Sequence, residues 1–168
     1  DTDAIARQLA CPGGGAMAAL AEAFGTSVID GDGGLDRAAM RALVFADADA
    51  KHRLEAILHP LIGEEAARQA REVRGVVVFD VPLLAESSNW RGRVERVLVV
   101  DCREATQRAR VLQRPGWSEQ TASAVIAQQA SRAARRACAD AVIFNDGLSL
   151  EQLALEVDAL YQCWVPMR

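Results

Sequence analysis

The sequence predicts an α/β protein whose parallel sheet is covered by helices on both faces. Three short runs are wholly apolar, at residues 76–79, 97–100 and 141–144. Strands of a buried parallel sheet have this composition because both of their faces are covered. The stretches between and around these runs repeat apolar residues at helical spacing, and alternation of strands and helices is typical of parallel α/β sheets. The chain offers no convincing strand before residue 75.

Capping residues set the boundaries of the expected helices. Asp36, Ser118 and Ser149 each precede a helical pattern, as N-cap residues do, and Gln152 completes a capping box with Ser149. Pro60 interrupts a long helical pattern and predicts a kink or a pair of helices. Helices are expected near residues 3–10, 17–24, 54–73, 103–112, 119–129 and 132–139. A further helix follows Asp36 and carries Met40, Leu43 and Val44. A last helix buries Leu150, Leu153, Val157, Leu160 and Trp164.

Composition indicates a single globular domain. The 168 residues are 51% apolar and 25% charged, and no apolar run approaches the roughly 20 residues that span a bilayer. The net charge of −4 argues against a nucleic-acid partner. The four cysteines are widely spaced, which favours reduced thiols in a cytoplasmic protein over a disulfide frame or a zinc site. We expect small-molecule substrates, no membrane association and a monomer.

Asp80 ends the first apolar run, which we predict to be a strand over Val76–Asp80. In open α/β sheets, ligands bind beyond the carboxyl ends of the strands. Asp80 is therefore either an active-site acid or a cap for the loop that Pro82 begins, and this stretch alone leaves the two readings even. Asp101 also ends a strand, and we interpret it as a capping residue.

Segments along the whole chain resemble dephospho-coenzyme A kinases. Asp1–Arg7 resembles the D-A-D-x-I-A-R motif of that family, Leu54–Ile62 its L-x-x-x-x-H-P-x-I motif, and Asp80–Glu86 its D-V-P-L-L-x-E motif. Arg96–Asp101 is similar to the next strand, Gln113-Arg114 to the start of the lid, and Ala139–Gly147 to the closing strand and adenine-side loop. Each match is short, and their shared order makes the resemblance specific.

The resemblance implies a P-loop kinase with a three-layer α/β/α core. Such an enzyme transfers the γ-phosphate of ATP, with Mg²⁺, to the 3′-hydroxyl of dephospho-coenzyme A. It implies one kinase domain, with a helical acceptor-binding subdomain at 1–73, a core at 75–112 and 140–165, and a lid at 113–139.

The resemblance also assigns roles to individual residues. Asp3 would accept the proton of the attacking hydroxyl, although an acid in the first helical turn also favours the helix dipole. Arg114 in the lid would neutralise transition-state charge. The acceptor side would be formed by Arg7, His59, Asp80, Pro82, Leu83, Leu84 and Glu86, and the nucleotide side by Arg114, Arg132, Arg135, Asn145 and Gly147. No protein metal site is expected, and Arg7 could equally lie in solvent.

One motif of the family is absent from the sequence. The phosphate loop G-x-x-x-x-G-K-[ST] holds the β- and γ-phosphates through its backbone amides and lysine, and the only lysine here is Lys51, between Ala50 and His52. In the family this loop, with its strand and helix, comes before the segment that matches Asp1–Arg7. We therefore expect a kinase fold that lacks its first strand and phosphate loop, and this chain alone to be inactive. The alternatives are a non-catalytic remnant that binds coenzyme A-like ligands, and another small-molecule P-loop kinase.

Overall fold

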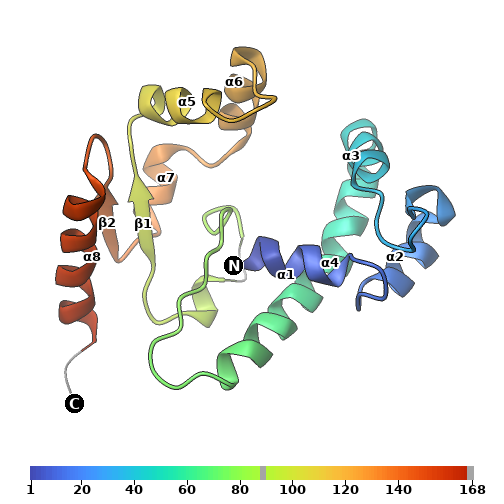
Figure 1. The fold of residues 1–168 in the computed structure, drawn as a ribbon, viewed down its shortest axis with the longest axis horizontal. Coiled ribbons are helices and arrows are strands. Elements are labelled where there is room, and N and C mark those ends of the chain that lie inside the picture. Colours follow the sequence, from blue (N-terminus) through green and yellow to red (C-terminus); the bar gives the residue numbers. More distant parts are fainter. Residues whose placement is uncertain (88–89, 166–168) are drawn as a thin grey trace. The chain divides into compact units, whose positions relative to one another are not determined.

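The structure is a computed structural model that describes residues 1–87 and 90–165 (Figure 1). Within these residues it is a mixed α/β protein. Its elements in chain order are α1 (Thr2–Leu9), α2 (Met17–Phe24), the 3₁₀ turn η1 (Thr26–Val28), α3 (Arg37–Ala46), α4 (Ala48–Arg71), the 3₁₀ turn η2 (Arg91–Arg93), β1 (Leu98–Asp101), α5 (Glu104–Leu112), α6 (Glu119–Gln128), α7 (Arg132–Ala137), β2 (Ala141–Phe144) and α8 (Leu150–Trp164).

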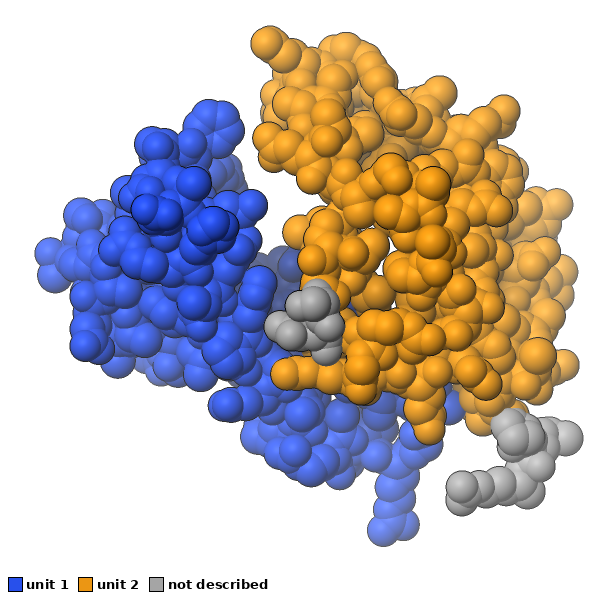
Figure 2. Space-filling view, turned by 180° about the vertical axis from the view of Figure 1, so that it is seen from behind, with its two compact units in different colours: residues 1–81 blue, residues 82–168 orange. Residues whose placement is uncertain are grey.

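The chain divides into two compact units, Asp1–Val81 and Pro82–Arg168, which Figure 2 colours separately. The first unit is helical and contains α1 to α4. The second contains the sheet and α5 to α8. No helix in the described part of the chain is long and apolar enough to cross a membrane.

The apolar core of the first unit lies where α1, α2 and α4 meet. Ala16 and Leu20 are completely buried there, and Met17 and Ala10 lie beside them. Partly buried side chains of α4, including Leu54 and Leu58, pack against this cluster. These apolar side chains form the inward faces of α2 and α4.

Short-range caps fix the helix ends in this unit. The carboxylate of Asp36 accepts hydrogen bonds from the amides of Ala38 and Ala39, so the predicted N-cap of α3 is confirmed. Gly25 ends α2 with a φ of 75°, which suits glycine. Pro60 does not divide α4, which is one helix of 24 residues ending at Arg71. Of the two alternatives expected at Pro60, the pair of helices is wrong, since the loss of one amide donor does not end the helix here.

The sheet of the second unit has two parallel strands in the described residues. β1 pairs with β2, and Leu98 aligns with Ala141 and Asp101 with Phe144. The connection between them carries α5, α6 and α7 (Figure 1). The second and third predicted strands are thus confirmed as a parallel pair, although β1 starts at Leu98.

The first predicted strand is not formed. Residues 76–80 are not assigned to any strand, and Val76 and Val78 are 48% and 82% exposed. A strand needs a neighbour that satisfies its main-chain groups, and no described segment pairs with these residues as a strand. Apolar composition predicted the burial of this segment, but burial depends on a neighbouring strand.

The last helix also differs from expectation. Ser149 and Gln152 form the predicted capping box, but α8 has no buried residue. Leu150 and Val157, which we predicted to be buried, are 85% and 43% exposed. Helical periodicity identified the helix correctly, while the burial of its apolar side chains needs contacts that periodicity cannot supply.

Candidate active site

Thr2 attaches the start of the helix that carries Asp3 to the main chain of Asp80 in the first unit. The main-chain amide and the hydroxyl of Thr2 both donate to the carbonyl oxygen of Asp80, each at 3.0 Å. Thr2 is buried, and Asp3 follows it in the first turn of α1. The start of α1 is thereby attached to the end of the segment 76–80, and the carboxylates of Asp3 and Asp80 are both exposed to solvent.

Arg7 lies one turn after Asp3 and pairs with an acid. Its guanidinium is 3.6 Å from the carboxylate of Asp1, and both side chains are about half exposed. Asp1 also caps α1 by accepting from the amide of Ala4 at 2.9 Å. Surface pairs of this kind are weak and are screened by salt, so Arg7 remains able to exchange Asp1 for an anionic substrate group.

The other acceptor-side residues lie on α4 and on a turn. His59 is exposed on α4, next to Pro60. Pro82, Leu83 and Leu84 form the turn that follows Asp80, and Leu83 is 51% exposed. An apolar side chain presented to solvent at a predicted acceptor site is available for contact with a ligand.

Glu86 has a structural partner in the second unit. Its carboxylate accepts a hydrogen bond of 2.7 Å from the amide of Ala130, at the junction of α6 and α7. The carbonyl of Ala130 in turn accepts from the guanidinium of Arg135 at 2.5 Å. Both sides of this junction are therefore held by charged side chains, which form stronger hydrogen bonds than neutral ones.

Asp101 is the centre of a buried ion-pair cluster at the carboxyl end of β1. Its side chain is 2% exposed and accepts from Nε and Nη2 of Arg132 at 2.7–2.9 Å. Nη1 of Arg136 lies 3.3 Å from the same carboxylate. The guanidinium of Arg132 also lies 5.3 Å from the ring centre of Phe144 on β2, a favourable cation–π distance.

The interpretation of Asp101 as a cap is therefore wrong. The N-cap of α5 is Arg103, which makes no side-chain capping bond. Asp101 binds instead the arginines of α7, which lies about thirty residues later in the chain. A pattern of neighbouring residues cannot indicate a pairing over this distance. Hydrogen bonds from Arg132, helped by the charges of Arg132, Arg136 and Arg135, hold the pKa of Asp101 below its ordinary value, against the opposing effect of burial.

The loop after β2 meets the same end of the sheet. The amide of Asn145 donates to the carbonyl of Asp101 at 2.8 Å. Asp146 accepts from the hydroxyl of Thr106 at 2.6 Å and pairs with Arg103, and these hydrogen bonds lower its pKa. Gly147 follows with a φ of 90°, which permits the sharp turn. Asn145, Gly147 and Arg132 are thus gathered at one edge of the sheet.

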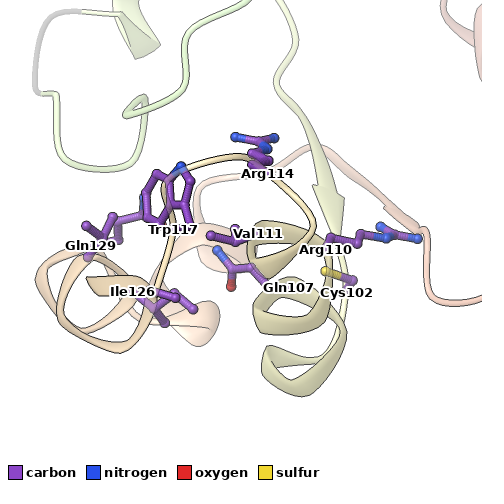
Figure 3. A pocket seen from close by; sticks show the side chains of 10 residues that line it. Cys102, Gln107, Arg110, Val111, Arg114, Trp117, Ile126 and Gln129 are labelled. Carbon is purple, nitrogen blue, oxygen red and sulfur yellow. The ribbon is translucent and has the colours of Figure 1, made fainter. Parts of the chain in front are cut away.

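A cavity of about 280 Å³ lies between α5 and α6 (Figure 3). Val111, Trp117 and Ile126 line it, and Arg110 and Arg114 contribute to its rim, with the guanidinium of Arg110 pointing away from Trp117 (Figure 3). Nη2 of Arg110 reaches Asn145 at 3.5 Å. An aromatic ring beside an apolar hollow suits an aromatic ligand.

Comparisons with known proteins identify the family of the chain. A model of the family described as dephospho-CoA kinase matches residues 1–151. This chain belongs to the dephospho-CoA kinase family. A dephospho-CoA kinase of Burkholderia lata is 54% identical over 163 residues, which are 96% of this chain and 81% of the relative. That of Bordetella pertussis is 48% identical over 169 residues, 99% of this chain and 79% of the relative.

Solved structures show the same fold. The crystal structure of TT1252 from Thermus thermophilus has a TM-score of 0.82 and 29% identity, covering 99% of this chain and 84% of that one. The dephospho-CoA kinase of Campylobacter jejuni has a TM-score of 0.68 at 22% identity, covering 96% of this chain and 82% of that one. These two structures support the predicted P-loop-type α/β fold.

Sequence reasoning missed two residues of the site. Thr2, which attaches α1 to Asp80, was passed over because a threonine at a helix start has many ordinary roles. The pairing of Asp101 with Arg132 was missed because it depends on tertiary structure. The one available signal was an acid at a strand end together with the basic run Arg132, Arg135 and Arg136.

Proposed function

We propose that this member of the dephospho-CoA kinase family transfers the γ-phosphoryl group of ATP to the 3′-hydroxyl of dephospho-coenzyme A. The observation that carries the proposal is the family match over residues 1–151, supported by the attachment of the Asp3 helix to Asp80. Transfer in kinases of this type depends on positioning and on neutralising phosphate charge. The proposal places the enzyme in the cytoplasm.

On the acceptor side, the proposal gives Asp3 the role of proton acceptor. An exposed carboxylate in the first turn of α1 can accept the proton of the hydroxyl and orient its oxygen for attack. Arg7 would bind a phosphate group of the acceptor in exchange for Asp1. His59 and the turn Pro82–Leu84 would contact the rest of the coenzyme A precursor.

On the nucleotide side, arginines provide positive charge. Arg132 and Arg135 lie on α7, and Arg114 at the cavity between α5 and α6. A guanidinium can donate two parallel hydrogen bonds to two oxygens of one phosphate group, and it stays charged at any physiological pH. Asn145 and Gly147 would form the adenine side, because the loop that contains them lies beside the same strand ends.

Mg²⁺ would arrive with the phosphates of ATP. Such ions keep several waters and use one or two protein carboxylates. Asp80 offers one exposed carboxylate. In this proposal the metal is held mainly by the nucleotide, and the ion would supply charge neutralisation at the transferred group.

The test is a coupled assay of the native gene product with ATP and dephospho-coenzyme A, with shikimate and nucleoside monophosphates as alternative acceptors. We expect transfer to dephospho-coenzyme A alone. The variant Asp3→Asn should lower kcat about 10²-fold or more, because it removes the proton acceptor. Asp49→Asn is the matched control, since Asp49 has the same place in the first turn of α4.

Two results would contradict the proposal. Equal losses of kcat in Asp3→Asn and Asp49→Asn would show that Asp3 only stabilises its helix. The second candidate is a non-catalytic protein that binds coenzyme A-like ligands. An absence of transfer by the native gene product, with a raised melting temperature in dephospho-coenzyme A, would establish that second function.

A further inference from the structure

We propose that Asp101 is a positioning residue, which holds Arg132 and Arg136 in the orientation that binds the phosphate chain of the nucleotide. The inference rests on the proposed function and assigns a role to an acid that makes no contact with substrate itself. The inference also implies that α7 stays fixed to β1 when the lid moves.

The first argument is the geometry of the cluster. Arg132 uses Nε and Nη2 for the carboxylate of Asp101, and its Nη1 makes no hydrogen bond within residues 1–87 and 90–165. Arg136 uses Nη1 alone. Each guanidinium therefore keeps donors for a second anion after it has bound Asp101. Two arginines four residues apart on α7 would repel each other without the acid between them.

The second argument is the burial of the acid. The side chain of Asp101 is 2% exposed, whereas those of Arg132 and Arg136 are 39% and 51% exposed. Asp101 thus lies under the arginines, and the arginines face solvent. A dissolved anion can reach the guanidiniums and is kept away from the carboxylate. The cluster carries two positive charges and one negative, so its surface is cationic.

The third argument concerns α7 as a whole. Arg132 attaches the start of this helix to β1, and Glu86 and Arg135 hold the peptide groups of Ala130 just before it. The hydrogen bonds from Arg132 and Arg136 to Asp101 oppose any movement of α7 away from β1, and those at Ala130 fix the residues just before the helix. Arg132 and Arg136 are accordingly stationary donors, in contrast to the expectation that Arg132 travels with the lid.

The experiment titrates the chain with inorganic tripolyphosphate in a calorimeter, in wild type and in Asp101→Asn. If Asp101 only neutralised positive charge, its removal would strengthen anion binding. If it positions the arginines, asparagine places an amide against Nη2 of Arg132, and the affinity should fall about tenfold. The two readings therefore predict opposite signs, and unchanged or tighter binding overturns the proposal, as does a wild-type chain that binds no tripolyphosphate.

Further variants separate positioning from folding. Glu104→Gln is the matched control, because Glu104 pairs with Arg108 at 3.0 Å on the same unit and is exposed; its affinity should match wild type. Should circular dichroism show that Asp101→Asn does not fold, Arg132→Lys decides. It keeps the charge and loses the two-pronged contact, so we expect a loss of about fivefold, and wild-type affinity overturns the proposal.

Tripolyphosphate binding needs no turnover. One outcome is weaker tripolyphosphate binding in Asp101→Asn together with no phosphoryl transfer by the wild-type protein. It supports the role of Asp101 and contradicts the proposed function. A chain that transfers phosphate normally and binds tripolyphosphate equally in both forms contradicts the role of Asp101 alone.

Discussion

Replacing Thr2 by valine should loosen the attachment of α1 to the segment that ends at Asp80. Valine has nearly the shape of threonine and lacks the hydroxyl. The substitution therefore removes the 3.0 Å bond from the hydroxyl to the carbonyl of Asp80 and leaves the 3.0 Å bond from the amide. Thr2 is 8% exposed, so water cannot readily replace the lost donor.

The expected cost follows from what the change leaves behind. A typical hydrogen bond contributes about 0.5–1.5 kcal/mol, and larger losses arise when a buried partner is left unpaired. The carbonyl of Asp80 keeps the amide of Thr2 as a donor, so no group is orphaned. We therefore expect a loss of about 1 kcal/mol, which corresponds to a melting temperature about 2–4 °C lower in a chain of this size.

Differential scanning calorimetry of Thr2→Val and of the matched control Thr121→Val measures this cost. Thr121 also makes a side-chain hydrogen bond, to Ser118, but the pair is exposed, and its variant should stay within about 0.5 kcal/mol of wild type. A loss of more than about 3 kcal/mol would refute the reasoning, because it requires an unsatisfied group. A loss equal to that of the control would refute it as well.

Three further changes probe the core, a close approach and the response to acid. Leu20→Ala should cost about 2–5 kcal/mol in urea unfolding, since Leu20 is completely buried, and a cost below about 1 kcal/mol would contradict the assigned core. Gly14→Ala should lower the free energy of unfolding by about 1–3 kcal/mol, because a Cβ there would lie 2.2 Å from the carbonyl oxygen of Leu9. Gly15→Ala is the control and should be close to neutral, since its Cβ would meet only an ordinary contact at 3.5 Å. The pKa of Asp101 is held below its ordinary value of 3.8. Its contribution to stability should therefore be complete above about pH 4 and disappear as the pH falls through the lower folded pKa. Plots of the free energy of unfolding against pH should differ in slope below pH 4 between wild type and Asp101→Asn, and parallel curves would contradict the pairing.

Interactions between residues close in sequence were predicted well. The N-caps Asp36, Ser118 and Ser149 each bond an amide two or three residues later, so the sequence around them contains the whole interaction. The family resemblance was also carried by short segments, and the match over residues 1–151 confirms it.

Features that depend on distant partners were predicted less well. Val78 has the composition of a buried strand and is exposed, because a strand is defined by its neighbour. Val157 lies on the apolar face of α8 and is also partly exposed. Asp101 has a partner 31 residues away in Arg132. In each case the sequence identifies the chemical character of the side chain, while the rest of the fold decides what it contacts.

The pairing of β1 with β2 has a consequence for how the second unit forms. Val99 aligns with Val142 across the sheet, and the intervening residues 102–140 carry three helices. Bringing the strands together closes a long loop, and its entropic cost precedes any gain from the strand contacts. The helices α5, α6 and α7 can form early from local contacts, and the ion pair of Arg132 with Asp101 then shortens the remaining loop. Strand pairing should consequently be the late and rate-limiting event in refolding of this unit.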